Sequence, residues 1–148
     1  MLLGEFLREH AGLSIRQQDL DALDVLTGKS VGYIDFNDAP SQNFEPSGDA
    51  FTSPFFYPIG YHNDDEVGLN LLPGHLDWDR LPVAHNDHTE VSDVSPMLAD
   101  YVRRHLLSLE GDICDEEEDP HEDDSLIEAV ATANEAFGEG FYMIGRFG

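Results

Sequence analysis

Apolar residues recur every three or four positions in four stretches of this chain, a spacing typical of helices that bury one face. The four sets are Leu2, Leu3, Phe6 and Leu7; Leu20, Leu23 and Leu26; Leu98, Tyr101, Val102, Leu106 and Leu109; and Leu126, Val130, Ala133 and Phe137. In the second set, the polar residues Asp19, Asp21 and Asp24 would lie on the outer side of the helix. The pattern therefore predicts four helices, two at each end of the chain.

Capping patterns predict where three of these helices begin. Ser14-Ile15-Arg16-Gln17 and Ser125-Leu126-Ile127-Glu128 both have the form of a capping box, in which a hydroxyl and a Gln or Glu side chain satisfy free backbone amides. Ser95-Pro96 is typical of an N-cap followed by the first helical residue. Gly28 is placed to close the second helix in a left-handed conformation, and Gly138 is a natural stop for the fourth.

Between the second and third helices the pattern changes to short apolar runs. Val31–Phe36 is rich in β-branched and aromatic residues, and Val67–Leu72 alternates apolar and other residues, so both are predicted strands. Asn37–Asp49 is a predicted loop, and Phe51–Ile59 is an edge or irregular strand, because Pro54 and Pro58 interrupt it. A polar turn is predicted at Gly60–Glu66. A short apolar run follows at Leu81–Ala84, before a turn at Asn86-Asp87, and a final strand is predicted at Phe141–Ile144. We therefore predict an α+β fold in which helices pack on a twisted, largely antiparallel sheet arranged as a meander.

The length and composition of the chain indicate that residues 1–148 form a single domain. The chain has 148 residues, of which 41% are hydrophobic, enough for a single core. No apolar run is long enough to cross a membrane, and the first residues lack the basic and apolar segments of an export signal. Cys114 is the only cysteine, which excludes an intrachain disulfide. These features predict a soluble, cytoplasmic protein that does not associate with membranes.

The charge narrows the class of partner. Against 31 Asp and Glu residues stand only 7 Lys and Arg, giving a net charge of -24. Such a surface repels nucleic acid and attracts basic proteins over long distances. A second interpretation is a surface adapted to a high-salt cytoplasm, since Lys29 is the only lysine. The acids are densest in Glu110–Asp124, which is predicted to be a solvated linker before the last helix.

No arrangement of residues predicts an enzyme, a metal or another cofactor. His85-Asn86-Asp87-His88, with His62 and His75 upstream, is the densest histidine cluster, but it has no HExxH pattern and flanks a turn. The acidic run lacks the ligand spacing of a calcium loop. Cys114 lies among acids that disfavour its thiolate, and neither a GxSxG motif nor a phosphate-binding glycine loop is present. We expect a nonenzymatic protein, with an enzyme of unrecognised type as an alternative.

One part of the chain resembles a known superfamily. Phe55-Phe56-Tyr57-Pro58-Ile59-Gly60, a polar turn and Val67–Leu72 are followed by a tryptophan-containing turn, a strand with a His- and Asp-rich turn, and a helix. The last three are Leu76-Asp77-Trp78-Asp79, Pro82-Val83-Ala84-His85-Asn86-Asp87 and Ser95–Leu109. This order resembles the core of the SUKH superfamily, which unites fungal cell-wall-synthesis regulators with bacterial toxin-immunity proteins. The resemblance spans about a third of the chain, from Phe55 to Leu109.

The resemblance implies a nonenzymatic α+β domain that acts by binding another protein. Together with the acidic charge, it predicts an immunity protein that binds and neutralises a basic, nuclease-type toxin; a regulatory or scaffold interaction domain is the alternative. The candidate partner-binding residues are Asp64, Asp65 and Glu66 in one turn and Asp77, Trp78 and Asp79 in the next. Trp78 would be the aromatic anchor, or else a half-buried core residue. The oligomeric state is left open.

Overall fold

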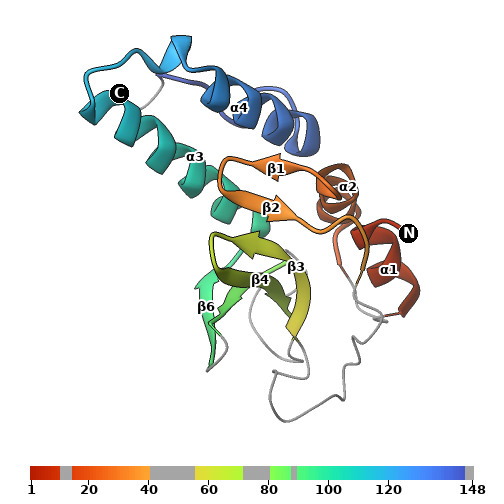
Figure 1. Ribbon diagram of the computed structural model, residues 1–148. Coiled ribbons are helices and arrows are strands. Elements are labelled where there is room, and N and C mark those ends of the chain that lie inside the picture. The colour runs from red at the N-terminus through yellow and green to blue at the C-terminus, as the bar shows by residue number, and fades with distance from the viewer. Residues whose placement is uncertain (11–14, 41–55, 72–80, 88–89, 146–148) are drawn as a thin grey trace.

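The computed structural model describes residues 1–10, 15–40, 56–71, 81–87 and 90–145, which form helices and an antiparallel sheet (Figure 1). The helices are α1 (Leu3–His10), α2 (Gln17–Leu26), α3 (Leu98–Asp115) and α4 (Asp124–Phe137), with a short 3-10 helix, η2 (Pro120–Glu122), before α4. The strands are β1 (Ser30–Val31), β2 (Ile34–Phe36), β3 (Phe56–His62), β4 (Asp65–Asn70), β5 (Val83–Asn86) and β6 (Val91–Ser95). The predicted α+β fold is confirmed.

The sheet is a meander in which each strand pairs antiparallel with the next, in the order β1 to β6. Its register places Val67, Leu69 and Val83 on one face, where they are fully buried. Apolar residues of α1 to α4 belong to the same core cluster, including Leu7, Leu23, Leu106 and Leu126. The apolar side chains that recur at helical spacing therefore pack the helices against the sheet, as the sequence predicts.

The predicted strand Val31–Phe36 is instead a hairpin, with β1 and β2 joined by a turn at Gly32 and Tyr33. Gly32 has a φ of 59°, in the left-handed region that favours glycine. A Cβ on Gly32 would also lie 2.5 Å from both His105 Nε2 and Leu109 Cδ1. The turn therefore forms because a glycine allows the chain to reverse in close contact with α3.

β3 differs from the prediction because it is an inner strand, paired with β2 and β4, rather than an edge strand. A β-bulge between Pro58 and Gly60 shifts the register of the β3–β4 pair. At a bulge, a proline disturbs the hydrogen bonds between strands least, so β3 can be an inner strand. The predicted polar turn is also shorter: Gly60 to His62 belong to β3, and Asp65 and Glu66 to β4. β6 was not predicted, and the part of the predicted strand before Phe56 lies outside the described residues.

The helices begin at residues other than those predicted. Arg16 precedes α2 and Met97 precedes α3, and neither makes a side-chain cap. Asp123, not Ser125, caps α4: its carboxylate accepts a hydrogen bond of 2.9 Å from the Leu126 amide. Ser14 lies outside the described residues. Gly28 has the expected positive φ, 75°, and α4 ends at Phe137, directly before Gly138, as predicted.

The predicted acidic linker is wrong in the first six of its 15 residues, because α3 continues through Glu110 to Asp115. Glu110 is buried, and its Oε1 accepts hydrogen bonds of 3.1 Å from the Tyr142 hydroxyl and the Gly145 amide. Two donors satisfy the carboxylate, so it can be buried. The predicted final strand is likewise wrong: Phe141 stacks on Phe137, and its neighbour Tyr142 is buried against α3.

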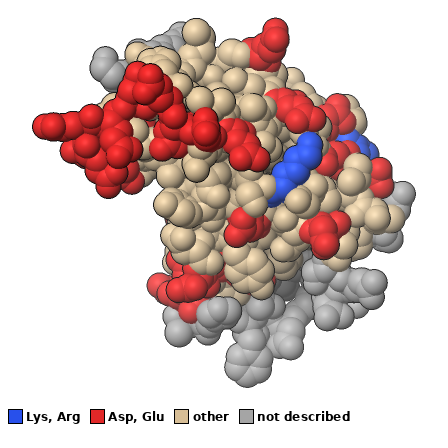
Figure 2. All heavy atoms as spheres, turned by 45° about the horizontal axis from the view of Figure 1, so that its top comes forward, with Lys and Arg blue, Asp and Glu red and all other residues tan. Residues whose placement is uncertain are grey.

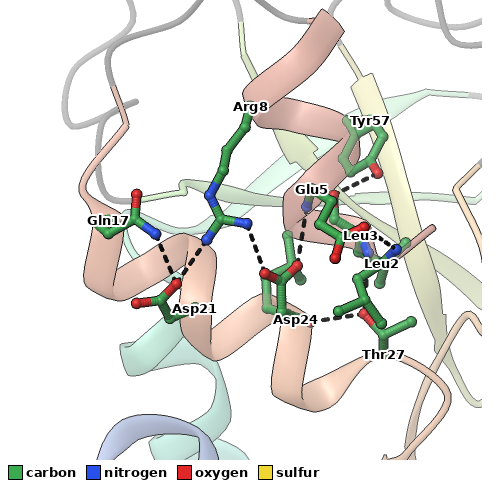
Figure 3. A network of polar contacts seen from close by, with 10 residues as sticks. Leu2, Leu3, Glu5, Arg8, Gln17, Asp21, Asp24, Thr27 and Tyr57 are labelled. Carbon is green, nitrogen blue, oxygen red and sulfur yellow. Dashed lines mark hydrogen bonds and ion pairs between the residues drawn. The ribbon is translucent and has the colours of Figure 1, made fainter.

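A polar network joins the first two helices (Figure 3). Arg8 on α1 forms ion pairs of 2.7 Å with both Asp21 and Asp24 on α2. Asp24 also accepts a 3.0 Å hydrogen bond from the Glu5 amide in the first turn of α1. The single guanidinium thus bridges two carboxylates where α1 contacts α2, and these contacts fix the relative position of the two helices.

Arg8→Met is expected to lower the free energy of unfolding by about 1 kcal/mol, because the exposure of Asp21 limits what each ion pair contributes. Urea unfolding at low and high salt measures it, and the difference from the wild type should shrink as salt rises. Equal losses at both salt concentrations would contradict this prediction and show that Arg8 acts through short-range contacts that salt does not screen.

Candidate functional site

The predicted partner-binding acids of the β3–β4 hairpin do not point the same way. Asp64 lies exposed in the tight turn, while Asp65 and Glu66 are neighbours in β4 and therefore project to opposite faces. The Asp65 carboxylate lies 3.8 Å from His85 Nδ1, and Glu66 Oε1 accepts a 3.4 Å hydrogen bond from the side-chain amide of Asn86. The predicted residues Asp77, Trp78 and Asp79 lie outside the described residues.

Three histidines and a tyrosine meet between the sheet and α3. The Tyr101 hydroxyl lies 2.7 Å from both His62 Nδ1 and His85 Nε2. The ring of His105, one turn further along α3, lies 4.7 Å from the ring of His62, in an edge-to-face arrangement. His105 Nε2 accepts a 2.9 Å hydrogen bond from the Tyr33 amide in the β1–β2 turn. We call His62, His85, Tyr101 and His105 the histidine cluster.

The histidine cluster is built to hold neutral imidazoles. Tyr101 has one hydroxyl proton, so one of its two histidine partners accepts a hydrogen bond and the other donates one. Burial lowers the pKa of His62 and of His85, each below its usual 6.5. Burial, with the neighbouring His62, lowers the pKa of His105 to about 4. Burial also raises the pKa of Tyr101 above its usual range.

Two adjacent hollows lie along α3. The first, of about 400 Å³, is lined by the histidine cluster residues His62, Tyr101 and His105 and by Arg104. The second, of about 640 Å³, continues towards α4. Tyr33, Leu109 and Asp112 line both hollows. Tyr33 is 61% exposed and thus stands between them as an accessible aromatic ring.

The acids gather at the end of the molecule where α3 leads into α4. Figure 2 shows the red carboxylates as a nearly continuous patch over this end, at the upper left. Eight of them, at positions 112, 115–119, 122 and 124, are exposed. His121 is the only basic or titratable nitrogen side chain between positions 110 and 124. We call these eight residues and Asp123 the acidic end.

The predicted absence of a metal site remains a prediction. Within the described ranges, no group of three or more His, Cys, Asp or Glu side chains could hold a metal ion. His75 and His88, which belong to the histidine-rich part of the sequence, lie outside those ranges. His62 and His85 do come together, but the group between them is a phenol.

Sequence reasoning singled out His62 and His85 but missed Tyr101 and His105. Both lie on the inner stripe of α3, where the sequence pattern predicts only an apolar core role for Tyr101. Tyr101 and His105 are four residues apart on a helical stripe that faces a sheet, and both carry polar ring atoms. This spacing is the signal by which the sequence could have indicated a buried polar cluster. The register supplies the rest, because Gly60, Val67 and His85 pair in one row and His62 lies two residues from Gly60 on the same face.

No family model, no curated protein and no solved structure matches this chain. Among the residues that the structure describes, no helix combines the length and the apolar character needed to cross a bilayer. The features that remain for assigning a function are the acidic end, the two hollows and the histidine cluster.

Proposed function

We propose that this protein is a nonenzymatic binding module that recognises a basic partner protein through its acidic end. The observation that carries the proposal is the concentration of exposed carboxylates around the α3–α4 connection, on a chain whose net charge is -24. Such a patch attracts a cationic surface before contact and orients it. It also repels the phosphate backbone of nucleic acid.

We further propose that binding neutralises the partner, as in the toxin-immunity branch of the superfamily that Phe55–Leu109 resembles. A basic nuclease presents cationic residues where its phosphates bind, and a carboxylate surface of matching shape would cover them. The proposed compartment is the cytoplasm, where such an enzyme would meet its nucleic acid. The single cysteine fits a compartment in which disulfides are rare.

The test is co-expression of this protein with each basic nuclease toxin encoded in its source genome, followed by binding kinetics for any toxin that is neutralised. We expect a tight complex whose association rate constant falls steeply with salt, while the dissociation rate constant changes little. Tight binding of a basic protein without inhibition would favour a regulatory or scaffold role.

The acidic surface also has the salt-adaptation interpretation, which predicts a different result. In that case no basic protein binds at moderate salt, and the protein unfolds when molar salt is removed. This outcome, or a chemical reaction with a small substrate, would overturn the proposed function.

A further inference from the structure

The second hollow along α3 has an apolar floor. Leu109 and Ile113, one turn apart on α3, line it together with Leu126 at the start of α4. Tyr33 adds its ring from the β1–β2 turn. Leu109 and Ile113 are only partly buried by the protein itself, so this floor retains apolar surface that a partner could cover.

All charged side chains that line the same hollow are acidic, and Ser125 adds a hydroxyl group. Asp112, Asp115, Glu116 and Asp123 line it, and no Lys or Arg does. In the described part of the chain, Asp112, Asp115 and Glu116 form no ion pair. Asp112 and Glu116 follow Leu109 at the i+3 and i+7 positions, so acid and apolar groups share one side of α3. We call this hollow the acidic groove.

The aromatic residue at the edge of the acidic groove has a fixed backbone. The Tyr33 amide donates to His105 Nε2, and Gly32 permits the turn to contact α3 closely. The backbone of Tyr33 is therefore fixed, and its ring lies edge-to-face with the His105 ring, 6.0 Å between centroids, while most of the side chain remains exposed beside the groove. A fixed aromatic ring loses little conformational entropy when a ligand stacks on it.

We propose that the acidic groove is the seat of an arginine-rich segment of the partner, an inference that rests on the proposed function and locates its contact. An arginine stem can lie along the apolar floor while its guanidinium stacks on Tyr33 and forms paired hydrogen bonds with the carboxylates of the groove. The volume of about 640 Å³ accommodates more than one side chain, so a short segment fits. The carboxylates line a groove instead of converging on a point, which suits guanidinium groups and not a metal ion.

The test uses the purified full chain and a fluorescein-labelled peptide of alternating arginine and glycine, whose binding is followed by fluorescence anisotropy at low salt. The groove variant carries Asp112→Asn, Asp115→Asn and Glu116→Gln. Its matched control carries Glu117→Gln, Glu118→Gln and Glu122→Gln, which remove the same charge from exposed residues of the acidic end that do not line the groove. A second peptide contains citrulline, a neutral analogue of arginine, at every arginine position.

We expect the groove variant to weaken peptide binding at least about tenfold and the control variant to weaken it less than about threefold. The citrulline peptide should not bind measurably. Tyr33→Leu should weaken binding about threefold through loss of the stacking contact, whereas Tyr61→Leu, at another exposed tyrosine, should leave it unchanged.

Equal weakening by the two charge variants, equal binding of the citrulline peptide, or no binding of the arginine peptide to the wild type would each overturn the acidic groove as the site. The proposed function fails separately, when no basic protein partner binds in the co-expression test. Circular dichroism and urea unfolding of each variant show whether it keeps the fold.

Discussion

Replacing Gly60 with alanine is expected to lower the free energy of unfolding by about 3 kcal/mol or more. A Cβ at this position would overlap the carbonyl oxygen of Asp35 on the neighbouring strand β2. The obstructing atom belongs to the backbone, so it can give way only if the pairing of Gly60 with Phe36 is disturbed. Since this pairing joins the β1–β2 hairpin to the rest of the sheet, the effect should be among the largest of any single substitution.

Gly111→Ala is the matched control for this experiment. Gly111 lies in α3, and a Cβ there would meet no atom within 4 Å. Alanine is the better helix former, so this variant should be more stable than the wild type by about 0.5 to 1 kcal/mol. Urea unfolding of the two variants measures both effects. A Gly60→Ala protein within about 1 kcal/mol of the wild type would contradict the close contact between β2 and β3.

The protein is expected to lose about 3 kcal/mol of stability through His105 when the pH falls from 6.5 to 4. Above pH 6.5, the side chain is neutral in both the folded and the unfolded state. Below it, the unfolded chain takes up a proton with the usual pKa of 6.5, whereas the buried side chain does so only at about 4. The unfolded state therefore binds more protons across this window, and stability falls with falling pH.

His105→Gln isolates this contribution from that of the many carboxylates, whose protonation reduces charge repulsion over a similar pH range. Glutamine can still accept the hydrogen bond from the Tyr33 amide but does not titrate. The difference in unfolding free energy between wild type and variant, measured at several pH values, should change by about 3 kcal/mol between pH 6.5 and 4. A constant difference would mean that His105 titrates normally in the folded protein.

Elements with a long, regular pattern could be predicted from the sequence. The stripes of α3 and α4 identify both helices, and alternation at Val67, Leu69 and Leu71 identifies β4, although the strand ends at Asn70, one residue before Leu71. The break between β1 and β2 could not be predicted, because it depends on contact between Gly32 and His105, residues far apart in the chain. Pro58 led to the wrong prediction of an edge strand for a similar reason, since only the bulge beside it allows β3 to be an inner strand.

The acidic run shows how composition alone can mislead. Ten of the 15 residues in Glu110–Asp124 are acids, which favours a solvated linker. Glu110 is nevertheless buried, because Tyr142 and Gly145, more than 30 residues later, donate hydrogen bonds to it. The floor of the acidic groove was hidden in the same way: Ile113 stands alone among acids in the sequence, and only the α3 helix aligns it with Leu109.

The extension of α3 to Asp115 also gives the molecule a natural attachment point for a reporter. Cys114 is the only thiol, it is exposed, and it lies on a helix beside Ile113 and Asp115 of the acidic groove without lining the groove itself. A maleimide dye would therefore couple once per chain without replacing any residue. Because the helix fixes its anchor, the dye's emission would report occupancy of the groove in the unaltered sequence, in purified samples and in mixtures alike.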